Sequence, residues 1–134
     1  MSGYSGTPLP KKLGIKDDAR VALVAAPPEA ASLIAPLPPG AVLRSQLRGE
    51  ADVIVFFARR RRELEQRFDA LVAKLERDGS LWVAWPKRAS RVETDMTENV
   101  VREVALPRGL VDVKVCAISD VWSGLRLVRR RTNR

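Results

Sequence analysis

The stretch Asp52-Val53-Ile54-Val55-Phe56-Phe57-Ala58 is the strongest strand signal in the chain, and the other predicted elements are arranged around it. Consecutive apolar side chains mean that both faces of this strand must be covered, which is typical of a central strand in a parallel sheet. A helix is expected next, with one apolar stripe formed by Leu64, Phe68, Leu71, Val72 and Leu75. Asp78-Gly79 is predicted to end this helix, and Ser80–Trp85 to form another buried strand that Pro86 closes.

Three further elements are expected on the N-terminal side. Residues 20–26 form a strand that is apolar on both faces, and 41–44 form a weak second strand. Between them, Pro27-Pro28-Glu29 opens a short helix. At the start of the chain, Thr7 is predicted to cap a one- to two-turn helix, which Gly14 stops in the left-handed conformation.

The C-terminal side is predicted to hold one helix and two strands. Asp95 with Glu98 resembles a capping box, and Pro107 stops the helix that it starts. Strands are expected at 111–118 and 125–129, with 120–124 as a hairpin connection. The resulting order, β-α-β-β-α-β-α-β-β, predicts a single α/β domain with a mostly parallel sheet and an antiparallel C-terminal hairpin.

Length and composition bound the function classes. The 134 residues favour one domain, with residues 1–6 and 132–134 expected to be flexible ends. The chain has no His and one Cys, which excludes a His-based triad, an internal disulfide and a Cys-rich zinc site. It has no apolar run of the ~18 residues that a membrane span needs and no signal-peptide layout. We therefore expect a cytoplasmic protein.

The net charge of +8 favours an anionic partner such as a nucleotide, a phosphorylated metabolite, nucleic acid or an acidic protein surface. An alternative explanation is background composition, because Arg, Ala, Val, Leu and Pro are all frequent, as a GC-rich genome would produce. Clustering carries more information than the total. Basic residues gather at Lys11-Lys12, Arg59–Arg62, Lys87-Arg88 with Arg91, and Arg129–Arg131.

Two resemblances follow from these residues. From Asp52 onward the order of elements, with the local pattern Asp78-Gly79-Ser80-Leu81-Trp82-Val83, resembles the C-terminal half of Rossmann-like S-adenosylmethionine-dependent methyltransferases. A more specific resemblance covers nearly the whole chain and is to the small bacterial family catalogued as domain of unknown function 3052. The blocks that carry it are residues 4–9 with 11–16, Leu81–Lys87, and Gly109–Asp112 with Lys114–Ile118 and Trp122–Arg126. This family implies no activity and no catalytic residue.

The residues argue against the cofactor that the methyltransferase resemblance implies. Such enzymes need a Gly-rich turn after the first strand and an acid at the end of the second. Here the first turn, Ala25-Ala26-Pro27-Pro28-Glu29, has no Gly and two prolines, and the second strand ends in Arg44-Ser45-Gln46. The chain also lacks a phosphate-binding loop with a Gly-Lys-Ser or Gly-Lys-Thr ending. No cofactor is expected.

Other chemistry-bearing residues have simple structural interpretations. Cys116 is expected to be a buried structural thiol, and Asp17-Asp18 a solvated turn. Glu93, Asp95 and Glu98 could bind a metal through oxygen, but a capped helix start explains them more simply, so no metal site is expected. Trp122 is the tryptophan that a hairpin turn could expose.

One constellation supports a binding hypothesis. Ligands of open parallel sheets bind beyond the carboxyl ends of the strands. Two neighbouring strands deliver six basic side chains to that edge: Arg59, Arg60, Arg61, Arg62, Lys87 and Arg88. Guanidinium groups near a helix start suit an anion, whereas a solvated helix start in an Arg-rich protein is the competing explanation.

The sequence thus favours a non-catalytic binding or interaction module with a basic rim for an anionic small molecule or nucleic acid. The alternatives are a small enzyme on a phosphorylated or nucleotide substrate, using an acid such as Asp95, and a structural subunit that pairs with itself or with a protein partner. No catalytic residue is assigned.

Overall fold

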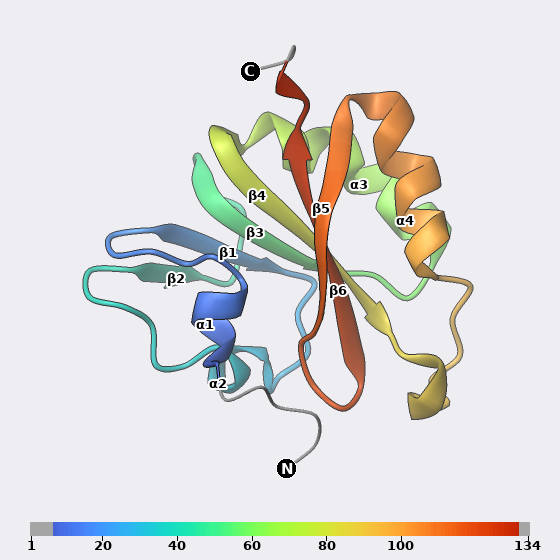
Figure 1. Cartoon of the computed structure of the whole chain (residues 1–134), viewed down its shortest axis with the longest axis horizontal. Helices are drawn as coiled ribbons and strands as arrows, with labels where there is room; N and C mark the ends of the chain where they lie inside the picture. Colours follow the sequence, from blue (N-terminus) through green and yellow to red (C-terminus); the bar gives the residue numbers. More distant parts are fainter. Residues whose placement is uncertain (1–6, 132–134) are drawn as a thin grey trace.

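The computed structural model describes residues 7–131, and their strands form one six-stranded sheet in the order β2-β1-β3-β4-β6-β5 (Figure 1). The first four strands in this order are parallel, and β6 runs antiparallel to both of its neighbours, β4 and β5. Their bounds are β1 Arg20–Val24, β2 Val42–Arg44, β3 Ala51–Phe57, β4 Leu75–Pro86, β5 Leu110–Ala117 and β6 Trp122–Arg129. The predicted α/β class, with its C-terminal antiparallel strands, is confirmed.

Helices cover both faces of the sheet. One face carries α3 (Arg61–Ala73) and α4 (Glu98–Ala105), and the other carries α1 (Leu9–Lys12) and α2 (Ala30–Leu33) (Figure 1). Two single-turn 3-10 helices, η1 (Arg88–Ser90) and η2 (Leu106–Arg108), follow β4 and α4. In the described part of the chain, no helix has the length and apolar character needed to cross a bilayer.

The two cores meet at the central strands, because β3 and β4 are apolar on both faces. Phe56 and Trp85 pack in the core beneath α3 and α4, whereas Val55 and Trp82 pack in the core beneath α1 and α2. The prediction that Trp82 and Trp85 point to opposite faces is confirmed. The Trp82 indole N–H also donates to the Leu13 carbonyl at 2.9 Å, which fastens the end of α1 to the sheet.

The junction between α3 and β4 differs from the prediction. Leu75 lies in β4 rather than in the helix, and Asp78-Gly79 lies inside the strand rather than in a turn that ends the helix. β4 is irregular here, because Ala51 faces Leu75 whereas Val53 already faces Ser80. A Cβ on Gly79 would lie 2.7 Å from the Asp52 carbonyl oxygen, so this irregular stretch needs a glycine.

Two helices begin at other residues than the sequence predicted. Pro8, not Thr7, is the N-cap of α1, although Gly14 has the expected left-handed φ of 77°. Thr97, not Asp95, caps α4, where its hydroxyl accepts from the Val100 N–H at 3.1 Å. In both cases the boundary moved by one or two residues, which periodicity alone does not fix.

The hairpin begins earlier than predicted. β6 starts at Trp122 and inserts between β4 and β5, so Trp122 faces Pro86 in the sheet. Its side chain is 2% exposed, and the expectation that the turn could expose it is wrong. The predicted flexible ends, 1–6 and 132–134, lie outside the described residues.

An ion pair joins the starts of β1 and β3. The Arg20 guanidinium and backbone N–H all donate to the Asp52 carboxylate, at 2.7 to 3.1 Å. These hydrogen bonds hold the pKa of Asp52 below its ordinary value. The folded state therefore binds this proton less readily than the unfolded chain does, and the pair stabilises the fold above the unfolded pKa.

We expect acid to remove that stabilisation as the pH falls through the pKa of Asp52 in the folded protein. The variant Asp52→Asn should lose less free energy of unfolding than the wild type between pH 7 and about pH 3, as urea unfolding would show. Asp69→Asn, at an exposed acid on α3, is the matched control and should retain the wild-type loss. Equal losses in wild type and Asp52→Asn would contradict this account.

A second prediction concerns Arg129, the last residue of β6. Its guanidinium donates to the carbonyl oxygens of Val72, Leu75 and Glu76 at 2.8 to 3.0 Å, where α3 ends. Arg129→Met should lower the free energy of unfolding by about 1–3 kcal/mol, because these carbonyls lose a charged donor. Arg77→Met makes the same chemical change on an exposed side chain. A loss of equal size in both variants in thermal or urea unfolding would show that Arg129 does not secure this junction.

Candidate anion-binding site

The predicted rim follows β3 and β4, but its side chains have different partners. The Arg59 guanidinium lies over Trp122, with Cζ 5.3 Å from the ring centroid. Arg60 pairs with Glu93 at 3.0 Å. The loop that holds Glu93 thus reaches back to the end of β3, and both arginines lie at the carboxyl edge of the sheet.

Arg61 is a structural anchor between the two long helices. Its backbone N–H donates to Asp95 at 2.8 Å, and its guanidinium pairs with Glu103 at 2.5 Å and with Glu65 at 3.2 Å. Hydrogen bonds from Glu103 and Glu65 raise the pKa of Arg61. This arginine is therefore engaged in fastening α4 to α3.

The side chains of the last three members of the predicted rim, Arg62, Lys87 and Arg88, are less constrained than those of Arg60 and Arg61. Arg62 is exposed on α3 and forms no ion pair within residues 7–131. The Lys87 backbone N–H donates to the Val121 carbonyl at 2.7 Å, which fixes the chain as it leaves β4. Arg88 follows on η1 and is exposed.

A cleft of about 550 Å³ opens beside this edge, where β4 ends. Its apolar lining comes from Trp85, Pro86, Val92 and Met96. Its charged lining comes from Arg88, Arg91, Glu93 and Glu98. Of the predicted rim, only Arg88 lines the cleft, and Arg91 is a lining residue that the sequence hypothesis did not include. The cluster Lys87-Arg88 with Arg91 was the signal that pointed to it.

Local hydrogen bonds shape the wall of the cleft. η1 ends at Ser90, and its C-cap Arg91 has a left-handed φ of 62°. The Thr94 hydroxyl then donates to the Arg59 carbonyl at 2.5 Å and accepts from the Met96 N–H at 3.0 Å. The loop between η1 and α4 is thereby tied to the end of β3.

The charges in the cleft are unequally compensated. Glu93 pairs with Arg60 and Glu98 pairs with Arg102, and neither arginine lines the cleft. Arg88 and Arg91 form no ion pair with any carboxylate in the described part of the chain. The two acids are thus neutralised from outside, and the two lining cations leave the cleft positive.

The remaining candidates have structural positions. Glu93, Asp95 and Glu98 each bond to a different arginine, and no group of three His, Cys, Asp or Glu suited to a metal occurs within residues 7–131. Asp17 and Asp18 are exposed in a turn. Cys116 is half-buried on β5 rather than fully buried, and burial raises the pKa of its thiol. A raised pKa disfavours the nucleophilic thiolate.

Comparison with known proteins identifies the family. A family model described as "Protein of unknown function (DUF3052)" matches residues 39–131. This range contains the second and third blocks of the sequence resemblance, whereas the block at residues 4–16 precedes it. No curated protein has significant sequence similarity to the chain.

Several solved structures, methyltransferases among them, have a similar fold. The putative type 11 methyltransferase from Sulfolobus solfataricus has a TM-score of 0.64 and 14% identity, over 91% of this chain and 89% of that one. The ribosomal protein L11 methylase from Lactobacillus delbrueckii subsp. bulgaricus has a TM-score of 0.61 and 12% identity, over 92% and 75%. TrmN from Thermus thermophilus has a TM-score of 0.59 and 14% identity. The matched region covers 91% of this chain but only 47% of the TrmN chain. At such identities the likeness shows the fold alone.

The residues at the switch point do not fit the cofactor that this fold implies. The strand order reverses between β1 and β3, and the turn after β1 carries Pro27 and Pro28, which have no N–H to donate. α2, which follows, is a single turn of four residues. β2 ends at Arg44, and that guanidinium donates to the Arg48 carbonyl at 2.6 Å. A cation stands where an acid would be needed to bind ribose hydroxyls.

We therefore expect isothermal titration with S-adenosylmethionine to show no binding in the micromolar range. A methyltransferase that binds this cofactor, titrated under the same conditions, is the positive control. Micromolar binding by this chain would show that the turn after β1 can hold the cofactor without glycine.

Proposed function

The chain belongs to the DUF3052 family, and we propose that it is a non-catalytic binding module for a small anionic ligand. The ligand would occupy the cleft at the end of β4. The observation that carries the proposal is that Arg88 and Arg91 line this cleft without an ion-pair partner among residues 7–131, while its two acids are neutralised by Arg60 and Arg102.

The size and lining of the cleft support a small molecule rather than an extended polymer. Its volume of about 550 Å³ falls within the ~300–1,000 Å³ of small-molecule sites. Guanidinium groups suit a phosphate or carboxylate, because each presents several N–H donors to one oxyanion. The apolar side chains of Trp85 and Met96 would cover the uncharged part of the ligand.

The enzyme alternative receives less support. Asp95, the acid that it would use, accepts from the Arg61 N–H and does not line the cleft. The carboxylates that do line it are already bonded to arginines. A general acid or base must reach the reacting proton, so these acids are poorly placed for that role.

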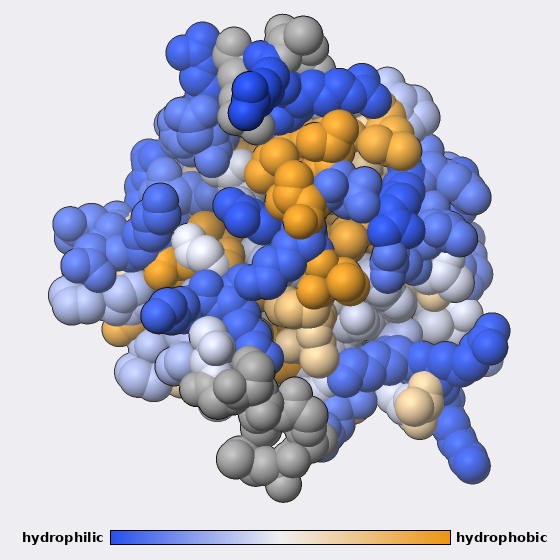
Figure 2. All heavy atoms as spheres, in the orientation of Figure 1, coloured by the Kyte–Doolittle hydropathy of each residue, from blue (hydrophilic) through white to orange (hydrophobic). Residues whose placement is uncertain are grey.

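The structural-subunit alternative has one specific observation in its favour. Val113 and Val115 on the edge strand β5 are 51% and 48% exposed. Figure 2 shows apolar surface over the region that β5 occupies in Figure 1. An exposed apolar patch on an edge strand suits pairing with another chain.

Thermal unfolding against a panel of anions separates these functions. The panel contains nucleotides, phosphosugars, S-adenosylmethionine and short oligonucleotides. A bound ligand at about 100 times its dissociation constant adds ~2.7 kcal/mol of stability. For a domain of this size the midpoint should rise by about 8 °C or more.

The double variant Arg88→Gln/Arg91→Gln should abolish that rise. The control Arg62→Gln/Arg77→Gln removes the same two charges from exposed positions outside the cleft and should retain it. A rise that survives the first variant would place the ligand elsewhere. A flat panel, with dimer formation by the wild type, would favour the structural subunit.

A further inference from the structure

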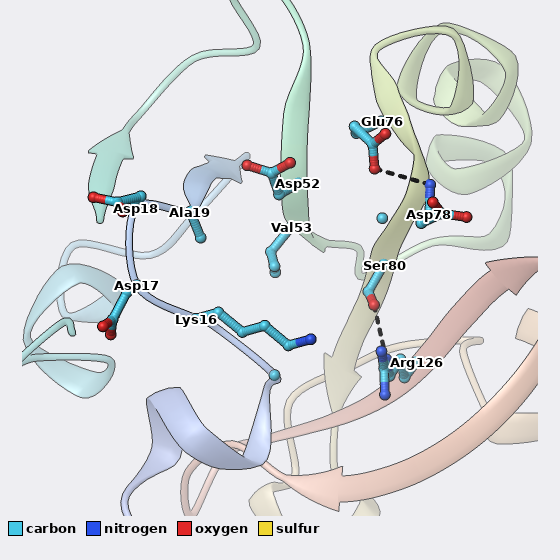
Figure 3. A pocket seen from close by; sticks show the side chains of 12 residues that line it. Lys16, Asp17, Asp18, Ala19, Asp52, Val53, Glu76, Asp78, Ser80 and Arg126 are labelled. Atoms are coloured by element: carbon cyan, nitrogen blue, oxygen red, sulfur yellow. Dashed lines mark hydrogen bonds between the residues drawn. The ribbon is translucent and has the colours of Figure 1, made fainter. Parts of the chain in front are cut away.

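A second hollow lies at the opposite edge of the sheet, where β1, β3 and β4 begin. It has a volume of about 310 Å³ and lies beside Gly14, Lys16, Asp52, Gly79, Ser80 and Arg126 (Figure 3). The segment after α1 forms one wall, and Trp82 holds that segment against the sheet through the Leu13 carbonyl. Nothing in the methyltransferase-like fold requires a ligand at this amino edge.

Two cations from distant parts of the chain converge in this hollow. Lys16 reaches across it from the segment after α1, and its ammonium points toward Arg126 of β6 (Figure 3). Neither side chain forms an ion pair with a carboxylate within residues 7–131. Two like charges that face each other repel, and an anion between them would relieve that repulsion.

Arg126 is held in place for such a contact. Its Nε donates to the Ser80 hydroxyl at 2.7 Å, and Ser80 is 4% exposed. The rest of the guanidinium faces Gly14, since a Cβ there would lie 3.9 Å from Cζ and Nη2. The terminal nitrogens of Arg126 therefore remain available as donors beside Lys16.

The nearby carboxylates do not neutralise these two cations. Asp52 is bonded to Arg20, and Glu76 accepts from the Asp78 N–H at 2.9 Å. Asp17, Asp18 and Asp78 also line the hollow, and Figure 3 shows their carboxylates directed away from Lys16. Five acids and two cations line the hollow, so a polyanion such as nucleic acid would be repelled, and a small anion would be held only where it contacts both cations directly.

We propose that this hollow binds a single small oxyanion, a phosphate or carboxylate group, between the Lys16 ammonium and the Arg126 guanidinium. This site is independent of the cleft at the end of β4, because the two share no lining residue. It assigns a ligand role to the segment after α1.

The test is an NMR titration of the ¹⁵N-labelled protein with inorganic phosphate and, separately, with acetate. The backbone amides of Gly14, Gly79 and Ser80 are the reporters. We expect saturable chemical-shift changes with at least one of the two anions. The anion that saturates identifies whether the hollow recognises a phosphate or a carboxylate group. Lys16→Met should weaken binding about 10-fold or more, because a charged hydrogen bond contributes roughly that factor. Arg126→Met should do the same.

Three results would overturn the proposal: no saturable shift at these amides with either anion, equal affinity in Lys16→Met and wild type, or the same shifts with sodium chloride. Lys16 is exposed, so Lys16→Met decides the question even if Arg126→Met fails to fold. Arg88→Gln, in the other cleft, should leave the affinity unchanged. If Arg88→Gln lost binding while Lys16→Met retained it, the anion would bind in the cleft at the end of β4. That result would contradict the proposed second site.

Discussion

The rest of the structure depends on the burial of β4 on both faces. From Leu81 to Trp85 every side chain is buried, and alternate ones enter opposite cores. A strand of this kind needs covers on both sides, and α3 with α4 supplies one while α1 with α2 supplies the other. The two candidate sites lie toward opposite ends of this strand. The cleft lies beside Pro86, and the hollow lies beside Gly79 and Ser80.

The insertion of β6 between β4 and β5 connects these features. Trp122 at its start supports the Arg59 guanidinium at the carboxyl edge of the sheet. Arg126 in its middle enters the hollow at the amino edge. Arg129 at its end donates to the Val72 carbonyl near the end of α3 and to the Leu75 and Glu76 carbonyls at the start of β4. One antiparallel strand thus contributes to the carboxyl edge of the sheet, to the hollow at the amino edge and to the junction between helix and sheet.

The arginines that follow β3 show the limit of reasoning from clusters. Four consecutive basic residues indicate a charged edge, but the contacts of each depend on loops far along the chain. Arg60 meets Glu93, and Arg61 meets Glu103, at separations of 33 and 42 residues. Arg91, the C-cap of η1, lines the cleft in a left-handed conformation, a backbone feature without a reliable sequence signal at a non-glycine position.

The fold class, the order of the elements and the burial of the central strands could be predicted from the amino-acid pattern, because apolar side chains at consecutive positions permit few arrangements. The sequence also indicated the family and the absence of a glycine turn after β1. Only the tertiary structure decided which charges are neutralised and which remain free. An ion pair depends on distances of a few ångströms between residues that are far apart in the chain, and periodicity does not encode such distances.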